Sequence, residues 1–140
     1  RMRGEGLALP AAAALLSPWT DLSGSGDSMS TRAQEDPMVS PDRLRTMAGA
    51  YLGGASETDP LASPLFADLA GLPPMLVQVG TAEVLLDDST RLARRAEAAG
   101  VEVRLETWED MLHVFHAFPS LPEAGRAIDG IGAYLRQRWA

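Results

Sequence analysis

Two histidines and three nearby carboxylates are the residues of this 140-residue sequence that could do chemistry: His113, His116, Glu83, Asp87 and Asp88. A carboxylate that orients an imidazole, which then takes a proton from a hydroxyl group, is the arrangement that nucleophilic acyl transfer needs. Imidazole suits this role because its ordinary pKa lies near neutral pH. The sequence has no cysteine, which excludes disulfides, thiolate metal ligands and a cysteine nucleophile. We therefore expect chemistry from serine, histidine and carboxylates, with no metal and no cofactor.

The composition restricts the partners further. All 12 basic residues are arginines, they form no cluster, and 19 acidic residues give a net charge of −7. Nucleic acid is therefore not an expected partner. No apolar run approaches the roughly 20 residues of a membrane span, and residues 1–9 lack the apolar core of a signal peptide. Because the chain begins at Arg1 rather than at Met, the cytoplasm is only a default assignment.

The elements that must position these residues alternate between strands and helices, which predicts an α/β fold with a mainly parallel sheet and flanking helices. Short apolar or alternating runs predict strands, although the alanines of the first run also allow a helix. Periodic apolar residues, an N-cap and glycine stops predict the helices. Strands are expected at residues 10–16, 75–79 and 101–107, and helices at 40–52, 85–99 and 121–138.

Two long connections separate these elements. Residues 19–36 are polar and rich in Gly and Ser, which predicts an irregular and mobile loop. Residues 58–74 contain four prolines, which predicts an extended surface connector. We interpret Arg91, Arg94 and Arg95 as the solvated face of their helix. In the last helix, the apolar residues that share one face are expected to pack on the sheet: Ala124, Ala127, Ile128, Ile131, Tyr134 and Leu135.

Glu83 and His113 fall where ligands bind in parallel sheets, beyond the carboxyl ends of the strands. Glu83 lies three residues after the strand expected to end at Val79, and His113 lies in the loop after the strand that follows next in the chain. The connecting helix makes these strands neighbours, so the two side chains are expected to approach each other.

Several segments carry a family resemblance. They are LPPMLVQVGTAEVLLDD (72–88), AAGVEV (98–103), MLHVFH (111–116), LLSPWTDL (15–22) and DPLASPL (59–65). Together, in their order along the chain, they resemble the C-terminal half of the bacterial hormone-sensitive-lipase-like carboxylesterases, which have the α/β-hydrolase fold. The resemblance implies that His113 is the general base of a Ser-His-acid triad and that Glu83 is the acid. The 30-residue spacing from Glu83 to His113 is similar to that of the family. Asp87 remains the alternative acid and Asp88 a more distant one.

The family's nucleophile elbow, G-x-S-x-G, has no match in residues 1–140, and neither has its oxyanion loop. We therefore expect the chain to be the C-terminal part of one catalytic domain, with the serine about a dozen residues before Arg1. Such a piece would expose an apolar sheet edge and should aggregate, pair with another chain or fold poorly alone. The resemblance also implies a homodimer through the edge strand from Val101 to Thr107.

The sequence thus predicts a carboxylic ester hydrolase that forms an acyl-enzyme with small ester substrates. A non-catalytic fragment or module is one alternative, and a lactonase or amidase on the same scaffold is another. We interpret His116 as a structural histidine. Trp19, Trp108, Phe115 and Phe118 could line an acyl pocket, although packing is the ordinary role of such residues.

Overall fold

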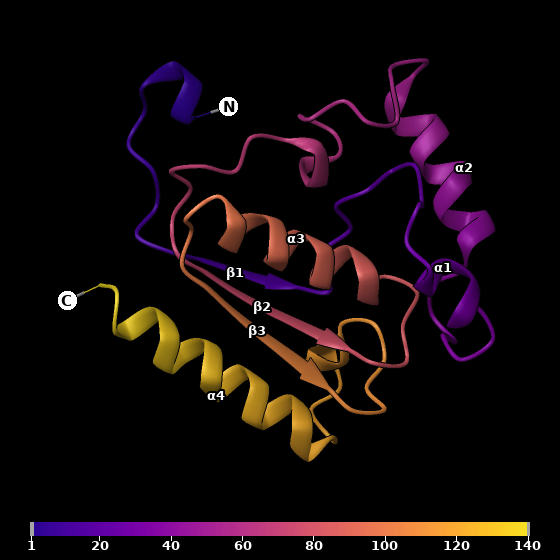
Figure 1. Ribbon diagram of the computed structural model, residues 1–140. Helices are drawn as coiled ribbons and strands as arrows, with labels where there is room; N and C mark the ends of the chain where they lie inside the picture. The colour runs from indigo at the N-terminus through magenta and orange to yellow at the C-terminus, as the bar shows by residue number, and fades with distance from the viewer. Residues whose placement is uncertain (1, 140) are drawn as a thin grey trace.

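Three short strands form one parallel sheet in the order β1-β2-β3. The computed structural model describes residues 2–139, and its strands are β1 (Ala13–Leu16), β2 (Met75–Gly80) and β3 (Val103–Trp108). The register pairs Ala13 with Met75 and Met75 with Val103. All three arrows point the same way in Figure 1, so the three carboxyl ends lie at one edge of the sheet. The predicted α/β fold with a parallel sheet is confirmed.

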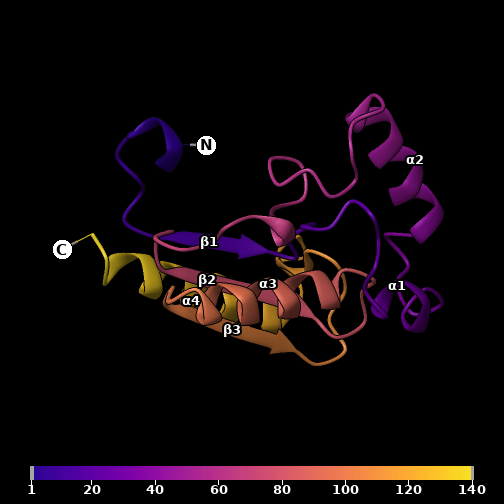
Figure 2. The same cartoon turned by 45° about the horizontal axis from the view of Figure 1, so that its top comes forward.

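Helices cover the two faces of this sheet. Figure 2 shows α3 (Leu86–Ala98) in front of the strands and α4 (Pro122–Arg136) behind them. Alternate residues of the central strand therefore contact different helices. Met75 and Val77 pack with α3, whereas the Gln78 side chain donates a hydrogen bond to Ala127 O of α4 at 3.2 Å. Every residue of β2 is buried. The core that positions the site is the contact of β2 with both helices.

Two strands begin later than their sequence pattern predicted. β1 begins at Ala13 rather than at residue 10, and its first ladder bond runs from Ala13 N to Pro74 O. β3 begins at Val103 rather than at residue 101, because Val101 N turns back to Ala96 O at the end of α3. The helical alternative for residues 10–16 is wrong.

The remaining elements are short or lie outside the sheet. α2 (Pro41–Leu52) begins as predicted, with Ser40 Oγ accepting a hydrogen bond from Arg43 N, and it stops at Gly53 in the left-handed conformation. The other helical segments are η1 (Arg3–Glu5), α1 (Ser28–Thr31), η2 (Pro64–Phe66) and η3 (Phe115–Ala117). No helix within residues 2–139 is long and apolar enough to cross a lipid bilayer.

α4 is shorter than predicted and packs through fewer residues. It runs from Pro122 to Arg136, and its buried residues are Ala124, Ala127 and Tyr134. Ile128, which the periodicity placed on the packed face, is 50% exposed. Ala124 and Ala127 pack against Phe115 of η3, and Trp108 at the end of β3 packs against the same cluster.

The connection 19–36 contains the short helix α1, and hydrogen bonds that its composition did not predict tie it to α3. Asp88 Oδ2, near the start of α3, accepts hydrogen bonds from Thr20 N at 2.7 Å and from Asp21 N at 2.8 Å. Asp87 Oδ2 accepts from Ser28 N at 2.9 Å. Composition alone missed this because the partners of the loop lie about 60 residues away in the chain.

Arg91 belongs to the same network and is not part of a solvated face. Its Nη2 lies 2.9 Å from Asp21 Oδ2 and 3.5 Å from Asp88 Oδ1. Arg94 and Arg95 are exposed, as predicted. One of the three arginines thus fastens the loop to α3 instead of facing water.

Burial and hydrogen bonds in this network shift the pKa values of its two acids in opposite directions. Burial raises the pKa of Asp88 to about 6, although the Thr20 and Asp21 N–H groups act in the opposite direction. Burial also acts to raise the pKa of Asp21, but hydrogen bonds from Ser23, Ser25 and Arg91 outweigh it and lower the pKa to about 2.

Gly80, at the carboxyl end of β2, allows the loop after β3 to cross close to the strand. A Cβ atom at this position would lie 2.0 Å from Met111 O and 2.5 Å from Met111 C, which are backbone atoms that cannot rotate away. The two loops that follow β2 and β3 can therefore touch only if residue 80 has no side chain.

We predict that Gly80→Ala lowers the free energy of unfolding by about 2–3 kcal/mol, because the added methyl group overlaps the Met111 backbone. Gly49→Ala is the control, since Gly49 lies in α2 and a Cβ there meets nothing within 4 Å. That variant should instead gain about 0.5–1 kcal/mol from helix propensity. Urea unfolding measures both. Equal effects of the two substitutions would contradict the assigned close approach.

We also predict a pH dependence from Asp88. Its pKa is raised from 3.8 to about 6 in the folded state, so between these values the folded state binds more protons than the unfolded state. Stability from this group is therefore present at low pH and lost as the pH rises through that window. Relative to the wild type, Asp88→Asn should gain on the order of 1–3 kcal/mol between about pH 4 and about pH 7.

The matched control for that measurement is Asp42→Asn, because the Asp42 side chain is 92% exposed. Unfolding curves across the pH range should give a constant difference between this control and the wild type. A constant difference for Asp88→Asn as well would mean that its carboxyl group is not perturbed.

Candidate active site

Glu83 lies in the turn that follows β2, and its side chain is completely buried. One carboxylate oxygen, Oε1, accepts hydrogen bonds from Gly80 N and from Ser17 Oγ, each at 2.7 Å. The other oxygen, Oε2, lies 2.9 Å from His113 Nδ1. Every bond to this carboxylate therefore comes from the end of a strand or from the loop after one.

His113 lies in the loop after β3, and backbone hydrogen bonds tie this loop to the turn that holds Glu83. Thr81 N donates to Trp108 O at 2.9 Å, and Ala82 N donates to Met111 O at 3.1 Å. Neighbouring parallel strands thus bring the acid and the histidine together, as the sequence led us to expect.

The Glu83 carboxylate determines which ring nitrogen of His113 carries the proton. Because Oε2 can only accept, Nδ1 must carry the shared proton, which leaves Nε2 as the nitrogen with a free lone pair. The histidine side chain is 22% exposed, whereas Glu83 is fully covered. A buried carboxylate therefore holds a partly exposed imidazole.

His113 faces a cleft of about 560 Å³ between the end of β1, α2 and the loop after β3. Apolar side chains dominate the lining, and its titratable residues are His113 and Arg43 of α2. The apolar lining consists of Leu16, Pro18, Trp19, Met38, Val39, Leu44, Met47, Leu85 and Val114. Such a cleft can hold a small apolar molecule beside the imidazole of His113.

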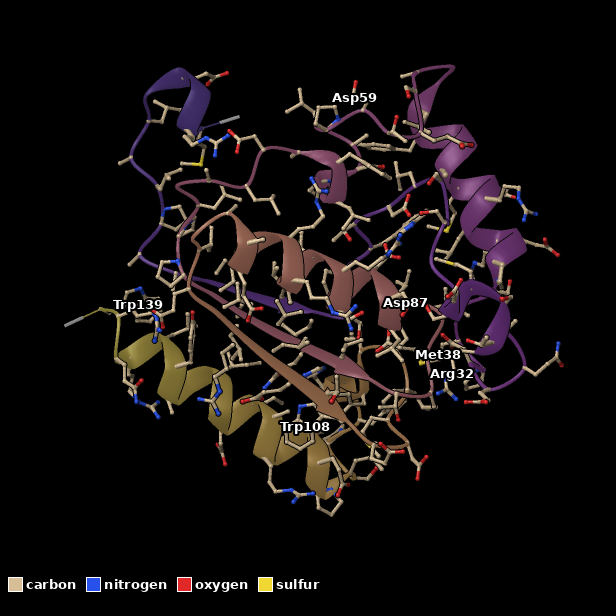
Figure 3. All side chains as sticks on the ribbon, viewed as in Figure 1. Arg32, Met38, Asp59, Asp87, Trp108 and Trp139 are labelled. Carbon is tan, nitrogen blue, oxygen red and sulfur yellow. The ribbon has the colours of Figure 1, made fainter. Side chains whose placement is uncertain are left out.

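The two alternative acids point elsewhere. Figure 3 shows Asp87 at the start of α3 beside α1, and its carboxylate accepts from Ser28 N. Asp88 is buried, and its carboxylate contacts the 19–36 connection. Neither has a hydrogen bond to His113 among the described residues, whereas Glu83 does.

His116 is buried and connects two elements of the fold. It is 8% exposed, and its Nε2 lies 2.9 Å from Gln78 Oε1, which connects η3 to β2. Burial lowers its pKa, although the Glu83 charge acts in the opposite direction. A neutral ring that donates from Nε2 fits this environment.

Only one of the four aromatic candidates lies at the cleft. Trp19 lines it, whereas Trp108 and Phe115 pack beneath α4 with ring centroids 5.5 Å apart. Figure 3 shows Trp108 at the end of β3, beside α4. Phe118 is 37% exposed and does not line the cleft.

Ser17 is the site residue that the sequence did not single out. It follows β1 directly, it is 3% exposed, and its hydroxyl binds Glu83 rather than His113. A serine directly after an apolar strand of a parallel sheet was the available signal. Because it contacts the acid, Ser17 does not occupy the position of a nucleophile beside Nε2.

Comparison with known proteins gives the family of this fold. Residues 1–117 match the family model for the alpha/beta hydrolase fold. An acetyl-hydrolase of Streptomyces hygroscopicus is 48% identical over 136 residues, which cover 96% of this chain and 46% of that protein. An esterase of Acinetobacter venetianus is 37% identical over 96% of this chain and 45% of its own length. The chain thus spans about half the length of these curated relatives.

Solved structures give the same result. An esterase from the bacterial hormone-sensitive lipase family superposes with a TM-score of 0.97 at 51% identity, over 99% of this chain and 47% of that one. A hormone-sensitive lipase from a metagenome library gives a TM-score of 0.95 at 44% identity, over 97% of this chain and 47% of that one. The matched part is roughly the C-terminal half of these relatives. This chain therefore belongs to the alpha/beta hydrolase fold family.

Proposed function

We propose that this chain supplies the acid and the base of a serine carboxylesterase, with Glu83 and His113 in these roles. The observation that carries the proposal is the 2.9 Å contact between the buried Glu83 carboxylate and Nδ1 of a histidine that opens onto an apolar cleft. The relatives named esterase and acetyl-hydrolase support the same type of reaction.

In this proposal Glu83 holds the imidazole with Nε2 directed to the nucleophile. His113 takes the proton of a serine hydroxyl as its oxygen attacks the ester carbonyl carbon, and then gives that proton to the departing alcohol. A water molecule, deprotonated by the same Nε2, attacks the acyl-enzyme and releases the carboxylic acid. Glu83 stays ionised and stabilises the imidazolium formed in each step.

The serine belongs, in this proposal, to a segment that precedes residue 1 in a longer catalytic domain. Two features of the described residues support this. The outer edge of β1 pairs with no strand in residues 2–139, although its residues are apolar. An apolar cleft of about 710 Å³ also lies beside Ala13 and Met75, at the amino ends of β1 and β2. Further strands beside β1 would satisfy this edge.

Small esters with short or medium acyl chains are the substrates that fit best. The 560 Å³ cleft is apolar and has few charged groups, which favours uncharged molecules. Lactones and amides undergo the same acyl transfer, so they are the comparison substrates for any activity assay.

We predict that Glu83→Gln in the complete protein lowers kcat for p-nitrophenyl butyrate by about 10³- to 10⁴-fold, because the amide no longer stabilises the imidazolium. His113→Ala should cause at least as large a loss. Asp87→Asn is the matched control, since Asp87 lies four residues later and contacts Ser28 rather than His113.

Stopped assays with purified variants measure these rates. An active Glu83→Gln variant with an inactive Asp87→Asn variant would assign the acid to Asp87. Serine-type turnover by the 140-residue chain alone would contradict the location proposed for the nucleophile.

We also propose a homodimer that pairs the outer edges of two β3 strands, because this edge pairs with no strand in residues 2–139. Arg104 lies on β3 with 59% of its side chain exposed, next to Glu106. Arg104→Glu should raise the dimer Kd at least about tenfold, because it brings like charges together at the shared edge.

Light scattering after size exclusion measures that shift. Arg45→Glu on α2 is the control, with 74% of the Arg45 side chain exposed. A monomeric wild type, or equal effects of both substitutions, would contradict pairing through β3.

A further inference from the structure

The Ser17 hydroxyl joins the acid to the loop that carries the base. Its Oγ donates to Glu83 Oε1 at 2.7 Å and accepts from Val114 N at 3.1 Å. Val114 directly follows His113 in the chain, and both residues belong to the loop after β3. One buried hydroxyl therefore touches the acid on one side and the neighbour of the base on the other.

The two donors to Oε1 determine which oxygen remains for the histidine. Ser17 Oγ and Gly80 N both bind Oε1, so the buried carboxylate cannot rotate to exchange its oxygens without losing two hydrogen bonds. Oε2 is thereby left to His113 Nδ1. Without the serine, the Gly80 N–H would be the one remaining donor to Oε1.

The loop that carries His113 depends on the same hydroxyl. Val114 has a φ of 47°, in the left-handed region that a β-branched residue rarely adopts. The hydrogen bond from Val114 N to Ser17 Oγ holds this conformation. Loss of the hydroxyl would leave the Val114 N–H without this partner and would free the loop to relax.

The backbone of Ser17 is itself held in an unusual conformation. Its φ is 45°, also in the left-handed region, and its N–H donates to Gln78 O at 2.8 Å, which continues the ladder between β1 and β2. This conformation turns the side chain from the strand end towards the carboxylate. An alanine here would keep the strain, whereas a glycine would relieve it.

We propose that Ser17 is a positioning residue for the acid–base pair, an inference that rests on the function proposed above. It acts by fixing the Glu83 carboxylate and the His113 loop in one geometry, because its hydroxyl bonds Glu83 and Val114 rather than the histidine ring. Its removal therefore lowers the rate of the chemical step and has little effect on substrate binding.

The test uses Ser17→Ala and Ser17→Gly in the complete protein with p-nitrophenyl butyrate. Both should lower kcat by about 10- to 100-fold, the effect of losing one hydrogen bond to a charged group, with KM nearly unchanged. Ser17→Gly has no left-handed strain, so it keeps the test valid if Ser17→Ala folds poorly. The proton NMR signal of the His113 Nδ1–H, identified by its loss in His113→Gln, should shift in both variants.

Ser63→Ala is the matched control. Ser63 is completely buried, donates to the backbone carbonyl Glu57 O at 2.5 Å and accepts from Leu22 N at 2.9 Å, so its hydroxyl also donates one hydrogen bond and accepts one from a backbone N–H, away from the site. This variant should lose stability but keep kcat and the His113 signal.

Two results would overturn the inference: wild-type kcat in both Ser17 variants, or an equal loss of kcat in Ser63→Ala. A Glu83→Gln variant that keeps its activity is a different result, because it would reject the acid–base pair itself.

Discussion

The complete burial of the Glu83 side chain constrains how the carboxyl ends of the three strands are arranged. Burying the Glu83 side chain removes its water, so donors from the protein must replace that water. The donors come from the ends of β1 and β2 and from the loop after β3: Ser17, Gly80 and His113. Satisfying one side chain therefore fixes the three strand exits relative to one another.

The close packing around this carboxylate explains several local features that look unfavourable in isolation. Ser17, Asp110 and Val114 all have positive φ values, and all three lie in the strand exits that meet near Glu83. Gly80 has no room for a side chain because Met111 O lies against it. Strained backbone at such a place is common at functional sites, where the surrounding bonds hold it. The strain and the missing side chain have one cause, which is the short distance between the loops.

Much of the fold could be predicted from the sequence because its signals are local. The alternating and apolar runs, the N-cap at Ser40 and the stop at Gly53 each depend on a few adjacent residues. The approach of Glu83 and His113 also followed from the sequence, since it needs only two neighbouring parallel strands and residues placed just after them. Strand starts shifted by two or three residues because a turn bond such as Val101 N to Ala96 O has no signal in hydrophobic periodicity.

The features that could not be predicted depend on partners far away in the chain. Ser17 and Glu83 are 66 positions apart, and Arg91 and Asp21 are 70 apart. A Gly- and Ser-rich stretch therefore seemed mobile although Asp87 and Asp88 hold its backbone. Ile128 fits the helical period but remains exposed, because periodicity assigns a face and not the width of the contact.

The central claim is that Glu83 and His113 serve a serine outside residues 1–140. The most direct measurement treats the complete protein with a fluorophosphonate, which reacts with serines activated by a base. Peptide mass spectrometry then locates the adduct. The account predicts an adduct on a serine that precedes residue 1, lost when His113 is replaced by alanine. An adduct on Ser17 or on another serine of this chain, or labelling that survives the loss of His113, would contradict it.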